Sequence, residues 1–517
     1  MLPFVKSLCF LSNILAAVEA ASIHIAPRSP LAATVRTTSG NIVGHEAAWP
    51  TNSGISEYLG IPFATPPLGD LRFAAPKPFK ENGTVQADTY GADCLQGEGL
   101  PASDPRTLDW LLAGGFSVKG YPRNKSEDCL TLNVWAKPQT GDKKKAVLIF
   151  LYGGAFMVGT TNAPAYNGAR LAAEEDIIVV TPNYRLNLFG WSHGPAPLPQ
   201  NVALLDQRLA VEWVRDNIAA FGGDPSRIIL SGESAGAFST DFYAYAWKED
   251  PIVAGFIAQS GVASFPMPEF GNLTDPWFAV AGMVGCGGAE KGVETVECMR
   301  RVDSSELQRA VGNMSVGGGL LTPFLPVPDG KTIFADGPAK SKAGDFIKKP
   351  MILGENNNEL NLLYAFAKLS PGPLLNGITS LASNAIFTCG IATTARDRVA
   401  GGVPAWRYRY MSTWNNTGLG PGIGAYHSSE IPLVFGTTEH KPFREAPARD
   451  EGEEGQVGRA MRGLWGAFVR DPVNGLVGKG WPVYKDQDLT LNRLGWENKA
   501  QLNLAKGNEY DAACPAT

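Results

Sequence analysis

The stretch that decides the fold is RIILSGESAGAF, residues 227–238. Its apolar start, RIIL, is typical of a strand buried on both faces of a sheet. Gly232-Glu233-Ser234-Ala235-Gly236 follows at once, and a helix-like run begins behind it. A strand that turns sharply into a helix holds its apex residue in a strained conformation, and side chains on either flank would clash there. The pattern therefore predicts a strand–turn–helix unit with the hydroxyl of Ser234 projecting from the turn.

Similar strand signals recur on both sides of this unit. Apolar or β-branched runs occur at 146–151 (AVLIFL), 176–181 (DIIVVT), 255–259 (GFIAQ), 351–354 (MILG) and 405–411 (AWRYRYM). Between two of them, residues 203–221 carry apolar residues at helical spacing and stop at Gly222-Gly223. Strands that alternate with helices imply crossover connections and a mostly parallel sheet covered on both faces. We expect an α/β fold.

Composition excludes several function classes. The chain has 517 residues, 44% of them hydrophobic, which is ample apolar material for a folded core. Its 45 basic and 50 acidic residues give a net charge of −5, so there is no electrostatic case for a nucleic-acid partner. There is no H-E-x-x-H motif, and we expect no metal or organic cofactor. Oligomeric state is left open by the sequence.

The first 20 residues have the composition of a secretory signal peptide. Lys6 gives a positive start, an apolar stretch follows, and Val18-Glu19-Ala20 suits cleavage. No later run reaches about 18 consecutive apolar residues, so no transmembrane anchor is expected. The C-terminal DAACPAT is neither an endoplasmic-reticulum retention signal nor an anchor-addition tail. We expect a secreted protein.

Cysteines and glycosylation motifs agree with export. Cys9 would be removed with the signal peptide, which leaves six cysteines and 15 possible pairings. Five N-x-S/T sequons predict N-glycosylation at Asn82, Asn124, Asn272, Asn313 and Asn415.

Several motifs together resemble the type-B carboxylesterase/lipase family, which includes cholinesterases and secreted microbial lipases. The matching segments are FGGDPSRIILSGESAGA (221–237), YLGIPFATPPLGDLRF (58–73), SEDCLTLNVW (126–135), YGGAF (152–156), LLDQRLAVEWVRDNIAAFGGDP (204–225) and WPVY (481–484). The resemblance implies one α/β-hydrolase domain from about residue 30 to residue 517. It also implies a serine nucleophile at Ser234.

A serine nucleophile needs a histidine base and an orienting acid, in the order Ser, acid, His. Of the five histidines only His427 and His440 follow Ser234 in the chain, and GAYHSSEIPLVFG (424–436) resembles the histidine loop of the family, so His427 is the expected base. The resemblance places the acid five residues after Gly354, at Glu359, with Glu355 as the alternative. Glu430 is expected to brace the loop.

The resemblance also assigns the oxyanion hole and the disulfides. Donors would be the backbone N–H groups of Gly154, Ala155 and Ala235, where the family often has a third glycine in place of Ala155. The family's two disulfide loops correspond to Cys94–Cys129 and Cys286–Cys298, which leaves Cys389–Cys514. In the secreted lipases the first loop is a movable lid. Here it contains the amphipathic run 107–116, TLDWLLAGGF, which could be a lid or a permanently packed helix.

The expected function is that of a secreted serine esterase or lipase acting on a small-molecule or lipid ester. Two alternatives remain open. One is a dedicated esterase or lactone-processing enzyme of natural-product biosynthesis. The other is a catalytically inactive, cholinesterase-like binding protein. The segment between Glu359 and His427 is shorter than expected for the family, so the shape of the acyl pocket cannot be carried over.

Overall fold

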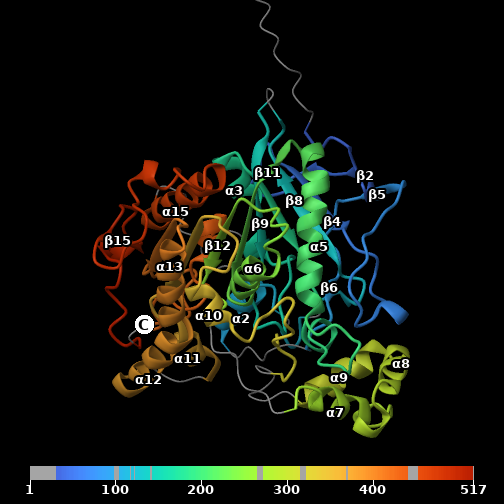
Figure 1. The fold of residues 1–517 in the computed structure, drawn as a ribbon. Coiled ribbons are helices and arrows are strands. Elements are labelled where there is room, and N and C mark those ends of the chain that lie inside the picture. The colour runs from blue at the N-terminus through green and yellow to red at the C-terminus, as the bar shows by residue number, and fades with distance from the viewer. Residues whose placement is uncertain are drawn as a thin grey trace, which may run out of the picture.

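The structure is a computed structural model, and it describes residues 31–97, 104–116, 118–121, 123–139, 143–264, 272–314, 322–367, 371–439 and 452–515. The predicted signal peptide, Cys9, His24 and His440 lie outside these ranges. The dominant element is an 11-stranded sheet, around which helices are arranged (Figure 1).

The strands of this sheet follow one another in space in an order that differs from their order in the chain. From one edge to the other they are β16 (Leu504–Lys506), β15 (Leu489–Leu494), β14 (Ala405–Tyr410), β13 (Met351–Asn356), β12 (Gly255–Gln259), β11 (Gly223–Glu233), β9 (Lys145–Leu151), β10 (Ile178–Pro182), β8 (Thr131–Ala136), β4 (Ser56–Pro62) and β3 (His45–Glu46). All pairings from β15 to β10 are parallel, and the outer pairings are antiparallel.

The N-terminal part of the chain also forms two small sheets. One contains β1 (Val35–Thr37), β2 (Gly40–Val43) and β5 (Thr84–Gln86), and the other pairs β6 (Asp93–Cys94) with β7 (Lys125–Ser126). The helices are α2 (Pro105–Ala113), α3 (Ala169–Glu175), α4 (Asn187–Gly190), α5 (Val202–Asn217), α6 (Ala235–Ala246), α7 (Asp275–Met283), α8 (Glu294–Arg301), α9 (Ser304–Met314), α10 (Gly337–Lys342), α11 (Leu362–Ala367), α12 (Pro373–Ser383), α13 (Cys389–Ala400), α14 (Ile431–Phe435) and α15 (Glu453–Arg470).

Helices cover both faces of the sheet. On β12, the ring of Phe256 lies 6.3 Å from that of Tyr243 on α6, whereas Gln259 accepts a hydrogen bond from Trp465 on α15. Because side chains alternate along a strand, residues three apart point to opposite faces, so α6 and α15 lie on opposite sides. Figure 1 shows α5 and α6 together in front of the central strands, and α7, α8 and α9 grouped to one side. The predicted α/β fold with a mostly parallel, doubly covered sheet is confirmed.

Three disulfides are present: the two implied by the family resemblance and the third that elimination left. Cys94–Cys129, Cys286–Cys298 and Cys389–Cys514 have Cα–Cα distances of 5.0, 5.6 and 5.2 Å. The last bridge ties the C-terminal tail to the start of α13. The asparagines of all five predicted glycosylation motifs are exposed on the surface.

One described helical run has the length and hydropathy that could cross a membrane. It extends over Pro373–Ala400, 28 residues, with a mean hydropathy of 1.3 in its most apolar window, 28% of which is buried. A single run of this kind is weak evidence for a membrane span, and among the described residues there is no stronger candidate. Asn, Ser, Thr and Gly interrupt the run, so it is not a stretch of consecutive apolar residues.

Candidate active site

Ser234 occupies the turn between β11 and α6, as the sequence predicts. Its φ of 53° and ψ of −122° lie outside the usual regions for a residue with a side chain. A Cβ atom added to Gly236 would come within 2.0 Å of the Leu151 carbonyl oxygen, and one on Gly232 within 2.3 Å of Gly236. Both glycines are therefore required by the close approach of β9 and of the turn itself. The turn is fixed further by the Ser234 N–H, which donates to the Gln259 carbonyl at 2.8 Å.

His427 and Glu359 meet at the same edge of the sheet. Glu359 lies just beyond β13, and His427 lies on the loop after β14. The Nδ1 atom of His427 is 2.5 Å from Oε2 of Glu359, and the His427 N–H donates to the Glu359 carbonyl at 3.1 Å. Parallel strands bring their carboxyl ends to one edge, which is why residues from three distant segments can meet there. A carboxylate bound at Nδ1 fixes the orientation of the imidazole and makes Nε2 the nitrogen that would transfer a proton.

The Glu359 carboxylate is held in place by further donors. Its Oε1 accepts from the Ser260 hydroxyl at 2.6 Å and from the Asn356 backbone N–H at 2.7 Å. The ring of Phe387 lies 5.3 Å from the His427 ring and packs against it. These supporting residues follow no motif, although Ser260 and Asn356 both stand at strand ends.

Two more carboxylates surround the histidine. The Nε2 atom of His427 lies 3.2 Å from Oε1 of Glu233, which also accepts from the Ser428 hydroxyl at 2.6 Å. Glu430 is fully buried and accepts from Gln259 at 3.0 Å and from Asn356 at 2.6 Å. Through these bonds Glu430 ties the loop that carries His427 to β12 and β13. Sequence reasoning named Glu233 only as the neighbour of Ser234 and missed its contact with the imidazole.

The charges of this cluster perturb its proton equilibria. Burial disfavours the imidazolium form of His427, but the carboxylates of Glu359 and Glu233 outweigh burial and raise the His427 pKa to about 9. Burial also raises the pKa of Glu430 to about 7, with the charge of Glu233 acting in the same direction. The pKa of Glu233 is raised by burial, against the opposing effect of His427. Buried titratable groups with shifted pKa values at one edge of a sheet are typical of an active site.

The loop after β9 approaches the same edge. Gly154 has a φ of 115°, and an added Cβ atom would lie 2.1 Å from the Val158 carbonyl oxygen, so only glycine fits. Ala155 has a φ of 52°, a left-handed conformation that favours glycine and accounts for the glycine often found there in the family. Among the described residues, no acceptor bonds to the N–H of Gly154 or of Ala155. Both groups can therefore donate to a ligand.

The helix of the first disulfide loop, α2, packs on the loop that carries His427. The Trp110 ring lies 6.2 Å from that of Tyr426 and 5.7 Å from that of Phe366 on α11. Leu111, on the same helix, is fully buried. The packing is incomplete, because a cavity of about 450 Å³ lies between Arg106 and the segment 410–429.

The remaining acid and histidine residues considered from the sequence lie away from His427. Glu355, the alternative acid, is buried against Arg407 and Arg409 on β14, at 3.4 and 3.2 Å, and its ion pairs account for its burial. His193 is buried with Nε2 at 2.7 Å from the Leu325 carbonyl oxygen, and His45 lies on β3. Within the described ranges, no group of three or more His, Cys, Asp or Glu side chains is arranged to hold a metal ion.

Comparison of the sequence with known proteins identifies the family to which this chain belongs. A profile of the Carboxylesterase family matches residues 31–373 and 365–512. This chain belongs to the carboxylesterase family. The chain is 37% identical over 449 residues to the chlorogenic acid esterase of Aspergillus niger. The aligned region covers 86% of this chain and 83% of that protein. It is 34% identical over 486 residues to secreted lipase 5 of Gibberella zeae, with 86% and 88% coverage.

A bacterial esterase is also similar. The para-nitrobenzyl esterase of Bacillus subtilis is 29% identical over 469 residues, with 84% of this chain and 90% of that protein covered. The fold, the family and these relatives make this carboxylesterase a carboxylic ester hydrolase.

Proposed function

We propose that this carboxylesterase is a secreted serine hydrolase in which Ser234 is the nucleophile, His427 the general base and Glu359 the orienting acid. The observation that carries the proposal is the contact of His427 Nδ1 with Glu359 at 2.5 Å. The other ring nitrogen lies 3.2 Å from Glu233, the residue next to Ser234 at the strained strand-to-helix turn. The Glu359 carboxylate fixes the tautomer, so that Nε2 can accept the serine proton.

The reaction follows from these roles. Ser234 Oγ attacks the ester carbonyl carbon while His427 Nε2 takes the hydroxyl proton. The oxyanion that forms accepts hydrogen bonds from the N–H groups of Gly154, Ala155 and Ala235. As the carbon–oxygen bond to the alcohol breaks, the imidazolium returns that proton to the leaving oxygen, and the acyl group remains on Ser234.

Water completes the cycle. It attacks the acyl carbonyl and gives a proton to His427, and the second tetrahedral adduct collapses with cleavage of the bond to Ser234 Oγ. His427 then protonates Oγ, and the carboxylic acid leaves. Atoms balance as one ester and one water giving one acid and one alcohol.

Labelling with a fluorophosphonate tests this proposal. The wild-type protein should be modified at Ser234, as located by peptide mass spectrometry, and the Ser234→Ala variant should not. Turnover of an ester should fall by about four orders of magnitude or more in Ser234→Ala. A folded wild-type protein that neither labels nor hydrolyses esters would support the binding-protein alternative instead.

The names of the relatives guide the choice of substrates to assay. Their names include a chlorogenic acid esterase and a lipase, which supports an assay over three kinds of ester: hydroxycinnamoyl, short-chain acyl and long-chain acyl. A preference confined to one elaborate ester or lactone, with simple esters untouched, would favour the biosynthetic alternative.

Export to the extracellular space is supported by the three disulfides, the five exposed sequons and a relative named as secreted. Expression in a eukaryotic secreting host should give medium-borne protein whose N-terminus is Ala21. Treatment with an N-glycosidase should lower its mass. Protein retained in cells with Met1 intact would contradict secretion.

A further inference from the structure

Gln96, a buried side chain next to the first disulfide, joins the root of that disulfide loop to the oxyanion loop. Its amide nitrogen donates to the Gly159 carbonyl at 3.0 Å, and its amide oxygen accepts from the Gly159 N–H at 3.1 Å. The same nitrogen donates to the Cys94 carbonyl at 3.2 Å. The Gln96 side chain is fully buried. A two-way pair of this kind fixes both the position and the orientation of the Gly159 peptide groups.

Gly159 in turn fixes the backbone of the oxyanion residues. A Cβ atom placed on Gly159 would be 2.6 Å from the Gly153 carbonyl oxygen, so the two backbones are in direct contact. Between them the loop closes tightly, because the Gly154 carbonyl accepts from the N–H groups of Met157 and Val158 at 3.0 and 3.1 Å. A displacement at Gly159 is therefore passed to Gly153 and Gly154.

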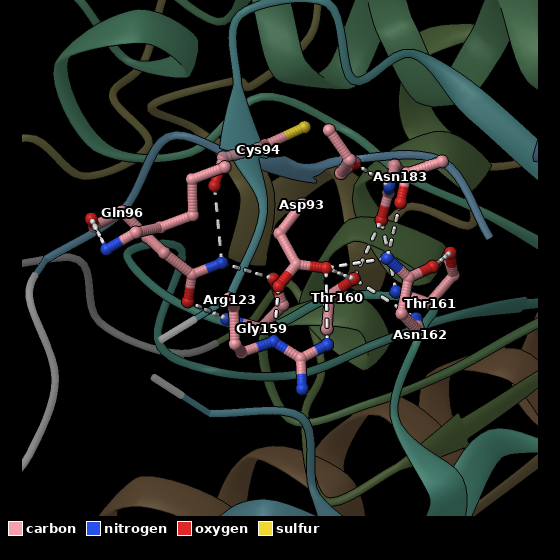
Figure 2. Close-up of polar contacts among 12 residues, drawn as sticks. Asp93, Cys94, Gln96, Arg123, Gly159, Thr160, Thr161, Asn162 and Asn183 are labelled. Carbon is pink, nitrogen blue, oxygen red and sulfur yellow. Dashed lines mark hydrogen bonds and ion pairs between the residues drawn. The ribbon is translucent and has the colours of Figure 1, made fainter. Parts of the chain in front are cut away.

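A second set of bonds fastens the residues that follow Gly159. The Asp93 carboxylate accepts from the Thr160 hydroxyl at 2.7 Å and from the Asn162 amide at 2.6 Å. It also pairs with Arg123, near the far end of the disulfide loop. Figure 2 shows Asp93 at the centre of this network, with Gln96 and Gly159 on one side and Asn162 and Asn183 on the other.

The two roots of the disulfide loop form one rigid frame. β6 and β7 pair in parallel at Cys94 and Ser126, the disulfide joins Cys94 to Cys129, and the Lys125 ammonium donates to the Gln96 carbonyl at 3.4 Å. The frame touches the oxyanion loop through Gln96 and Asp93, and none of its side chains has been placed in contact with substrate.

We propose that Gln96 is a positioning residue for the oxyanion hole: it holds the Gly159 backbone so that the N–H groups of Gly154 and Ala155 point to the developing charge. The inference rests on the proposed function, since it assumes that these groups stabilise an oxyanion. Donors aimed in advance at that charge give their full effect only in the transition state. Loss of Gln96 should therefore lower kcat rather than substrate binding.

The test compares two variants that remove equivalent bonds. Gln96→Met keeps the shape of the side chain and loses both bonds to Gly159. Asn201→Leu does the same elsewhere, since the buried Asn201 amide pairs with the Val327 carbonyl at 2.8 Å and with its N–H at 3.1 Å. Thermal unfolding reports the stability lost in each variant. Steady-state kinetics and the inhibition constant of a trifluoromethyl ketone, whose adduct carries an oxyanion, report transition-state stabilisation.

For Gln96→Met we expect kcat to fall by about 10- to 100-fold with KM within about twofold, and the inhibition constant to rise by the same factor as kcat falls. Asn201→Leu should lower the unfolding temperature and leave both quantities unchanged. The inference is overturned if Gln96→Met keeps wild-type kcat, or if Asn201→Leu loses kcat to the same extent at an equal folded fraction.

Should Gln96→Met fail to fold, Gln96→Glu keeps the inference testable. A protonated glutamic acid can both donate to the Gly159 carbonyl and accept from its N–H, whereas the carboxylate repels that carbonyl. Its kcat relative to wild type should rise as the pH falls, and a pH-independent ratio near one would contradict the inference. Fluorophosphonate labelling of the wild type tests the proposed function separately. If the wild type is labelled at Ser234 and the Gln96 variants keep the wild-type kcat, this inference is rejected and the proposed function stands.

Discussion

The Nε2 atom of His427 lies 3.2 Å from Oε1 of Glu233, the residue that precedes Ser234 in the chain. Since Nδ1 faces Glu359, the imidazole stands between two carboxylates, one on each nitrogen. Both negative charges favour the imidazolium form, which is the form needed after proton abstraction. The same charges raise the pKa of His427, so the imidazole becomes neutral only at a higher pH.

The first prediction concerns this pH dependence. His427 must be neutral to accept a proton, and its pKa is raised to about 9, so kcat/KM should rise with pH and reach half its maximum near pH 9 instead of near the ordinary histidine value of about 6.5. Glu233→Gln removes one charge that raises this pKa and should move the rising limb to lower pH. Glu212→Gln, at the Arg208 ion pair on α5, is the charge-matched control and should move nothing. An unshifted limb in Glu233→Gln would contradict the assigned electrostatics.

The second prediction separates the two candidate acids. Glu359→Gln should lower kcat by about four orders of magnitude, because an amide stabilises neither the correct tautomer nor the imidazolium. Glu355→Gln should keep kcat within a few fold, since Glu355 contacts Arg407 and Arg409 rather than His427. Steady-state kinetics on one ester decide between them. Equal losses in both variants would reject the assignment of Glu359.

The third prediction concerns the support of the helix that follows Ser234. Asp241 on α6 pairs with Arg398 on α13 at 2.6 Å, and both side chains are fully buried. Asp241→Asn leaves the guanidinium without a charged partner in the interior and should cost about 3–5 kcal/mol of stability. Asp345→Asn breaks partly exposed pairs with Lys248 and Lys340 and should cost less than about 1 kcal/mol. Denaturant unfolding measures both, and similar losses would count against the burial argument.

The fourth prediction concerns two disulfides. Cys389–Cys514 joins residues 125 apart, and Cys286–Cys298 joins residues 12 apart. Loop-closure entropy assigns about 5 kcal/mol of stabilisation to the longer loop and about 3 kcal/mol to the shorter one. Paired Cys→Ser variants, compared by denaturant unfolding, should therefore rank in that order. The reverse order would mean that the C-terminal tail is held by its other contacts.

Much of the fold was predictable, because the strand–turn–helix at Ser234 allows only one geometry. Neighbouring backbone atoms lie so close to Gly232 and Gly236 that a side chain at either position would clash, so the G-x-S-x-G motif predicts the turn directly. The meeting of His427 with Glu359 also followed, since both come after strands of one parallel sheet.

The remaining parts of the site depend on side-chain direction, which single-sequence patterns do not encode. Glu355 was a plausible acid until its register opposite Arg409 placed it on the wrong side of β13. Gln96 and Asp93 act through the backbone of a distant loop, and nothing in their local sequence reveals the partner. The burial of Leu111 depends on how α2 docks, which its amphipathic pattern leaves undecided.

The bridge between Cys389 and Cys514 fastens the segment around Cys514 to the helical run that carries Phe387. Phe387, whose ring packs on His427, precedes Cys389 by two residues. Loss of the bridge, by reduction or by proteolysis before Cys514, would therefore release the helix beside the imidazole without touching Ser234, His427 or Glu359. Recombinant production in a reducing cytoplasm would therefore alter the surroundings of His427 as well as the stability of the protein.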